Sequence, residues 1–246
     1  DEINWHYHPL SFDRNPTKCA ANYVNSFDVL NEVICRRIID ENWFPTVNRP
    51  GFHTERIDIH LFLEQWIPFD YANNVYDNDD SQSDLANGRF GDWQRASKSW
   101  TGYHPSHDDY QEIGNCRRLI FRCLNIGTRF KNIKEKHVLE AFEDADRKGT
   151  SILSFVNHDW RDIRPDIEYL RDLLIKSKKK YPNVKFKFAG ANEAARALIS
   201  KSNVFKEIII QLKGYMEGNK FIVEVERGKL FGPQPYLAIK TIDSRY

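Results

Sequence analysis

The sequence is poor in three features that would assign it to a broad class of proteins. No apolar stretch approaches the roughly 20 residues that a membrane-spanning helix needs, so we expect no membrane span. An excess of charge is also missing: 36 Lys and Arg stand against 35 Asp and Glu, which gives no electrostatic reason to expect a nucleic acid or an anionic lipid surface as partner. Four cysteines without a CxxC pair favour free thiols in a reducing compartment over a disulfide scaffold, and we therefore expect a cytoplasmic protein.

The chain does contain enough apolar residues for a sizeable core. Its 246 residues are 41% hydrophobic, which suits one large domain, or one domain with a small appendage. Aromatic residues make up 13% of the chain. Most aromatic rings in proteins are core residues, but flat rings also line sugar-binding clefts, so a carbohydrate partner fits the composition.

Strand-like and helix-like segments alternate through residues 1–200. Apolar residues recur at helical spacing in 25–43, 57–66, 134–147, 165–180 and 192–199. Short apolar runs predict strands at 44–52, 67–72, 118–126, 151–156 and 184–188, and the polar stretch 76–91 predicts a long surface loop. Repeated strand–helix pairs imply parallel strands with helices outside, hence an α/β sheet or barrel.

The pattern changes in the last part of the chain, residues 201–246. Three strand-like runs, 205–212, 220–225 and 236–242, are separated by Gly, Asn and Pro turns. We therefore predict a small C-terminal antiparallel β appendage that carries no catalytic residue.

A His-x-His pair, His6 and His8, lies near the start of the chain at a predicted strand end. Alternate residues of an extended segment point to the same side, so both imidazoles could reach one divalent ion. Strand ends just before helices are also where α/β folds place their sites. A structural or incidental His pair is the competing interpretation.

Two further clusters follow predicted strands. Arg49 precedes the turn 50–52, where an Arg can orient a carboxylate and a tight turn can expose the backbone N–H of Phe52 to an oxyanion. His158 follows an apolar strand with acidic residues nearby, a suitable place for a general acid or base.

The segment 92–110 mixes aromatic and polar residues, which suits a sugar cleft. A metal site that includes His104 and His107 is the alternative. The three histidines His53, His60 and His137 are interpreted as non-ligands, the last two on partly exposed helix faces. Residues predicted to bind substrate are Asp92, Trp93, Trp100, Tyr103 and His107.

Taken in order, these clusters resemble the motifs of the polysaccharide deacetylase family, carbohydrate esterase family 4. Residues 2–6 resemble its Glu-Ile-Gly-x-His segment, whose His binds metal, and His8 takes the place of the second metal His at a shorter spacing. Residues 49–52 are similar to the Arg-Pro-Pro-Tyr turn, and 152–158 to the Leu-Leu-x-His strand end that carries the general acid. Looser matches are residues 92–93 and 187–193.

The resemblance implies a distorted (β/α) barrel and a divalent metal, Zn²⁺ above all, in an enzyme that removes N-acetyl groups from a carbohydrate of surface polysaccharide or lipopolysaccharide. By the same match, Arg49 orients the catalytic base, the Phe52 N–H meets the oxyanion and His158 protonates the leaving amine. The family opens with a strand ending in Asp-Asp, for which this sequence has no counterpart. Because the first residue is Asp1 and not Met, we expect those carboxylates upstream. The rivals are a metal-free glycan-binding protein and a metal-dependent hydrolase of another substrate.

Overall fold

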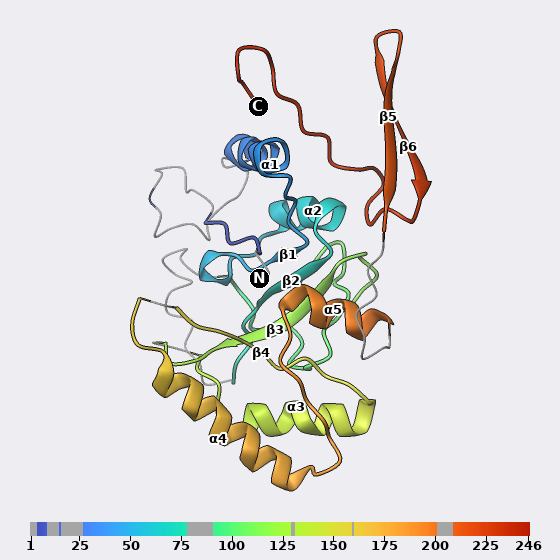
Figure 1. The fold of residues 1–246 in the computed structure, drawn as a ribbon. Helices are drawn as coiled ribbons and strands as arrows, with labels where there is room; N and C mark the ends of the chain where they lie inside the picture. The colour runs from blue at the N-terminus through green and yellow to red at the C-terminus, as the bar shows by residue number, and fades with distance from the viewer. Residues whose placement is uncertain are drawn as a thin grey trace.

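A computed structural model describes residues 4–8, 15, 27–77, 91–128, 131–158, 160–200 and 209–246. Its centre is a parallel sheet in the order β1-β2-β3-β4 that curls into half a barrel (Figure 1). The strands are β1 (Val47–Asn48), β2 (Phe69–Asn73), β3 (Leu119–Asn125) and β4 (Ser154–Val156). The predicted α/β class is therefore confirmed. The four described parallel strands form half of a barrel.

Residues 4–8 extend this sheet beyond β1. Trp5 forms a parallel bridge with Asn48, and the amide of Arg49 donates to the Trp5 carbonyl over 2.9 Å. The amide of Gly51 continues the ladder to the Tyr7 carbonyl at 2.9 Å. The His-x-His pair is thus on an extended segment at the sheet edge, as the sequence predicts.

Five helices pack around the sheet within the described residues. They are α1 (Phe27–Glu41), α2 (Ile57–Trp66), α3 (Glu135–Lys148), α4 (Arg164–Lys180) and α5 (Ala191–Ser200). Each overlaps a predicted helix, and α2 has the predicted bounds. Helix α3 ends at Gly149, which has a φ of +88°, a left-handed conformation that glycine adopts without steric cost.

The two faces of β3 belong to different cores because side chains alternate along a strand. Leu119, Phe121 and Cys123 form one apolar cluster with Ala195 of α5. On the other face, Ile120 packs with the rings of the loop that precedes β3, and Leu124 packs with α3 and α4. A fourth cluster joins α1, α2 and Trp5. Burying each large apolar side chain stabilises the fold by about 1.5–3 kcal/mol.

Two predicted strands are wrong. Residues 184–188 form no strand, and Phe186 and Phe188 are exposed. The Val184 carbonyl instead accepts from Lys178 of α4, and the Phe186 ring packs against Phe142 of α3. Residues 236–242 form none either, since Tyr236 packs its ring against Phe44 and Trp66 beside the helices. Most of the predicted loop 76–91 lies outside the described residues.

The C-terminal part contains one antiparallel hairpin, β5 (Gln211–Glu217) with β6 (Lys220–Arg227), which projects from the body of the molecule (Figure 1). The following segment returns along α1 and α2, where Tyr236 donates to Asn31 and Lys240 pairs with Asp40. Of the predicted run 205–212, residues 205–208 lie outside the described residues, 209–210 form no strand and 211–212 begin β5. No helix in the described ranges is long and apolar enough to cross a membrane.

Candidate metal and catalytic site

The imidazoles of His6 and His8 meet at the carboxyl end of their extended segment. Their Nε2 atoms lie 3.1 Å apart, which is the spacing of two nitrogen ligands on one ion. The Nδ1 atom of His6 lies 2.8 Å from the Arg49 carbonyl, a contact that fixes the ring when Nδ1 carries the proton. A backbone carbonyl bonded to Nδ1 leaves the Nε2 lone pair available for a metal.

Both rings are held in their neutral form. Both residues keep solvent contact, but the partial burial of His6, followed by the charge of Arg49, lowers its pKa to about 4. The same two causes lower the pKa of His8. Because a metal binds the neutral imidazole, the pair meets the protonation requirement of a ligand pair near neutral pH, and the residues present fit a divalent ion.

Arg49 begins the turn that follows β1, and its guanidinium is directed into the curl of the sheet. Nη2 lies 2.8 Å from His53 Nε2, and Asp70 and Cys123 are close enough to raise its pKa against the larger lowering by burial. Its Nε is buried and has no hydrogen-bond partner in the described structure. An unsatisfied buried donor of this kind costs about 1–3 kcal/mol, which an acceptor would recover.

The turn itself has an uncommon backbone. Phe52 and His53 both have positive φ, 53° and 52°, inside the 3₁₀ turn η3 (Gly51–His53). Non-glycine residues in this region are strained, and such strain gathers at functional sites. Trp93 stabilises the strained turn, because its indole N–H donates to the His53 carbonyl over 2.7 Å.

His158 lies just after β4 and reaches the same end of the sheet. Its charge lowers the pKa of both His6 and His8, which places it within electrostatic range of the pair. Its ring stacks on Trp160 with centroids 4.1 Å apart. Sequence reasoning named His158 but not Trp160, whose side chain is 74% exposed. The structure therefore brings His6, His8, Arg49 and His158 to the same end of the sheet.

A cavity of ≈ 1490 Å³ opens on the concave face of the sheet, and Asn4, Arg49 and Cys123 are among its lining residues. None of the five predicted substrate-binding residues lines it. Trp93, Trp100 and Tyr103 are instead buried in the cores, at 0%, 1% and 6% exposure. Their rings pack against protein in this structure, and Asp92 caps the backbone of Gln94.

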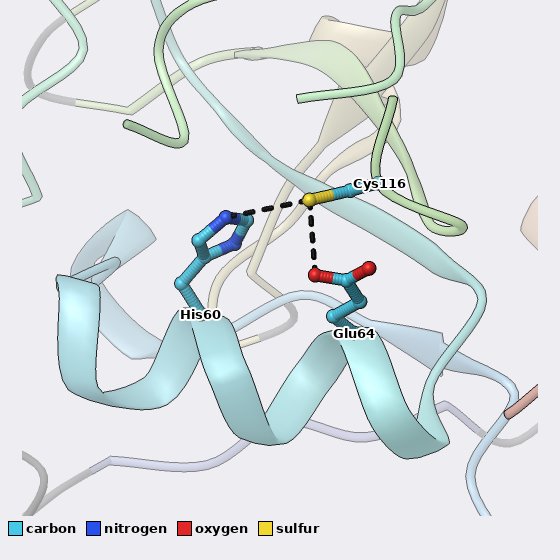
Figure 2. Close-up of side chains that lie close together, drawn as sticks. All are labelled: His60, Glu64 and Cys116. Atoms are coloured by element: carbon cyan, nitrogen blue, oxygen red, sulfur yellow. Dashed lines mark hydrogen bonds between the residues drawn. The ribbon is translucent and has the colours of Figure 1, made fainter. Parts of the chain in front are cut away.

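A second polar group lies outside the curl of the sheet, and sequence reasoning missed it. His60 and Glu64 project from α2 toward Cys116 of the loop before β3 (Figure 2). The prediction that His60 and His137 lie on partly exposed faces is wrong, because both are 0% exposed. The available signal was the spacing of His60 and Glu64, which puts both side chains on one helix face.

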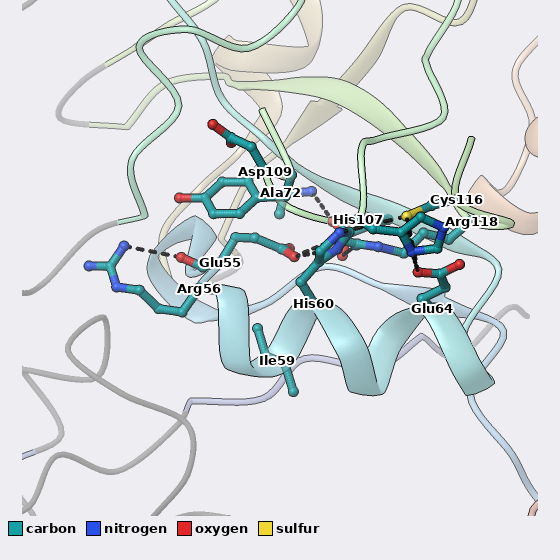
Figure 3. Close-up of polar contacts among 12 residues, drawn as sticks. Glu55, Arg56, Ile59, His60, Glu64, Ala72, His107, Asp109, Cys116 and Arg118 are labelled. Atoms are coloured by element: carbon teal, nitrogen blue, oxygen red, sulfur yellow. Dashed lines mark hydrogen bonds and ion pairs between the residues drawn. The ribbon is translucent and has the colours of Figure 1, made fainter. Parts of the chain in front are cut away.

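Buried charged residues lie next to this group, beside His60 (Figure 3). Arg118 of the chain entering β3 pairs with Glu55 and, over 3.2 Å, with Asp70 of β2, and all three are buried. Burial raises the pKa of Glu55 to about 8 in spite of Arg118. His107, the second imidazole of this group, is half exposed and pairs with Glu64 at 2.8 Å.

Comparison with known proteins adds no assignment: no family model matches the chain, and no curated protein or solved structure is significantly similar to it.

Proposed function

We propose that the protein is a metal-dependent hydrolase that removes N-acetyl groups from a carbohydrate. The observation that carries this proposal is the convergence of His6 and His8, with Nε2 atoms 3.1 Å apart, beside Arg49 and His158. These four residues come from three separate segments and meet at the carboxyl ends of parallel strands. That edge is where α/β folds assemble their active sites.

His6 and His8 would supply two ligands to a zinc-type ion. Such an ion, when bound, activates water and polarises an amide carbonyl. A carboxylate ligand and a general base complete the site in the family that the sequence resembles. The unpartnered Nε of Arg49 supports the presence of such a carboxylate, because it is a buried donor with no acceptor among the described residues.

The remaining roles follow from position. The strained backbone at Phe52 is suited to present its N–H to a developing oxyanion, and His158 to protonate the leaving amine. Trp160 stacks one face on His158 and has 74% of its side chain exposed, so a sugar ring could lie against it. We therefore add Trp160 to the substrate-binding residues.

The test is acetate release from N-acetylated oligosaccharides by the protein expressed from its complete coding sequence and loaded with Zn²⁺. We expect His6→Ala to lose the metal ion of this histidine pair and, with it, the activity. His158→Gln should keep the metal and lose about 10²–10⁴-fold in kcat, the usual contribution of a general acid. His104→Ala is the matched control, because its ring contacts backbone carbonyls of Cys116 and Arg118.

Metal binding without acetate release would favour a hydrolase of another substrate. Absence of metal at His6 and His8 would favour a glycan-binding protein that performs no hydrolysis.

A further inference from the structure

Four potential ligand atoms converge between α2 and the loop 103–118, away from His6 and His8. Cys116 Sγ lies 3.7 Å from His60 Nε2, 3.0 Å from Glu64 Oε2 and 3.4 Å from His107 Nδ1. His107 Nδ1 is also 2.8 Å from Glu64 Oε2. Tetrahedral zinc with bonds of about 2.0–2.3 Å places its donor atoms about 3.3–3.6 Å apart, and these four separations, 2.8–3.7 Å, are near that range. His60, Glu64 and Cys116 form the buried part of the set, and His107 lies at its exposed edge.

We propose that His60, Glu64, His107 and Cys116 form a structural zinc site that fastens α2 to the loop before β3. The mixture of one thiol, two imidazoles and one carboxylate suits Zn²⁺ better than Mg²⁺ or Ca²⁺, which prefer oxygen ligands alone. Four protein ligands leave no open position for water or substrate, which is the mark of a structural zinc centre.

The charges balance. Binding would release the proton of the Cys116 thiol, and the resulting thiolate and the Glu64 carboxylate would neutralise the two charges of Zn²⁺. The neutral result matters because Arg118, a buried cation, lies 2.6 Å from His60. In the metal-free arrangement Cys116 donates its S–H to Glu64.

A thiol nucleophile is the rival chemistry for this group, and the structure argues against it. Cys116 is 1% exposed. Burial, followed by the hydrogen bond to Glu64, raises the pKa of its thiol to about 12, whereas nucleophilic cysteines have a lowered pKa.

Metal binding would rearrange the hydrogen bonds of His60. In the metal-free state Arg118 donates to His60 Nδ1, so His60 Nε2 carries the proton and donates to the Ser106 carbonyl at 2.7 Å. Zinc at Nε2 would move that proton to Nδ1, where an acceptor is needed. Glu55 Oε1 lies 3.9 Å from His60 Nδ1 and already accepts from Arg118, so the Arg118 guanidinium would have to turn away from Nδ1 before Glu55 could accept that proton. Zinc-binding histidines commonly donate their other N–H to such a carboxylate.

The experiment measures zinc per chain in the complete protein carrying His6→Ala and His8→Ala, which removes the ligand pair of the proposed active site. We expect about one zinc to remain, to be lost when Cys116→Ala is added, and to be retained with Cys35→Ala. Cys35 is the matched control, a free and partly buried cysteine of α1. Substitution by Co²⁺ should give a thiolate charge-transfer band that Cys116→Ala abolishes.

A second variant covers the case in which Cys116→Ala does not fold. His107 has a side chain that is 53% exposed, so His107→Ala should fold while zinc affinity falls at least about tenfold. No bound zinc in the His6→Ala, His8→Ala protein would overturn the proposal. The proposal would also be overturned if His107→Ala left the zinc affinity unchanged and the Co²⁺ spectrum lacked a thiolate band.

Discussion

The imidazole of His8 occupies the space next to Gly51 that any larger residue would need. A Cβ on residue 51 would lie 2.2–2.4 Å from three atoms of the His8 ring. Gly51 is therefore required by the position of a proposed metal ligand rather than by its own backbone angles.

The first prediction concerns this contact. Gly51→Ala should push the His8 ring aside and weaken metal binding at His6 and His8 by about tenfold or more, the usual effect of disturbing a ligand's support. Isothermal titration of the metal-free protein with Zn²⁺ measures the change. Gly149→Ala is the control: it has open space around it but a positive φ, so it should destabilise by about 1 kcal/mol and leave metal affinity unchanged. Equal metal affinities in the two variants would show that the contact is unimportant.

A second prediction tests the buried ion pairs. Arg118→Met leaves Asp70 buried without its cation and Glu55 without its hydrogen-bond donor, and we expect the free energy of unfolding to fall by about 3–5 kcal/mol. Arg95→Met removes an exposed partner of Asp109 and should cost less than about 1 kcal/mol. Urea denaturation of both variants gives the comparison, and similar losses would contradict the assigned importance of the buried network.

A third prediction concerns acid stability. Burial and the charge of Arg122 lower the pKa of His137 to about 4 from 6.5. Because the Lys134 amide donates to Nδ1, protonation there would break that bond. Between pH 6.5 and about 4, His137 binds a proton in the unfolded chain but stays neutral in the folded protein. The contribution of neutral His137 is therefore complete above pH 6.5 and lost as the pH falls toward 4.

The loss should reach at most about 3 kcal/mol, at 1.36 kcal/mol for each pKa unit. His137→Asn keeps an acceptor for the Lys134 amide but does not titrate. Denaturation at pH 7 and pH 5 should show a smaller decrease for the variant than for the wild type. Because other buried histidines titrate in both proteins, the difference between the two isolates His137, and parallel decreases would refute the assignment.

Local patterns predicted the helices and the neighbourhood of His6, because both depend on residues close in the sequence. Helix α2 has the predicted bounds, and the alternation of an extended segment placed His6 and His8 on one side. The run 184–188 has a strand's alternation, yet it packs against α3 and α4 without forming a strand, and no local pattern reveals that.

The second ligand group was missed for a related reason. His60 and Glu64 share a helix face, yet Cys116 reaches them only after the chain has formed β2 and returned through the loop before β3. Trp93 and Trp100 show the same limit: their composition suits a cleft, but the packing of that loop buries them. Tertiary contacts decide whether such residues face a core, a metal or solvent.

The most direct measurement is the metal content of the complete protein, by elemental analysis, in the wild type and in the His6→Ala, His8→Ala double variant. The account predicts one metal ion fewer per chain in the variant, with the unfolding transition at pH 7 shifted little because both histidines lie at the exposed end of the sheet. The same metal content in both proteins would contradict the claim that this pair holds the ion.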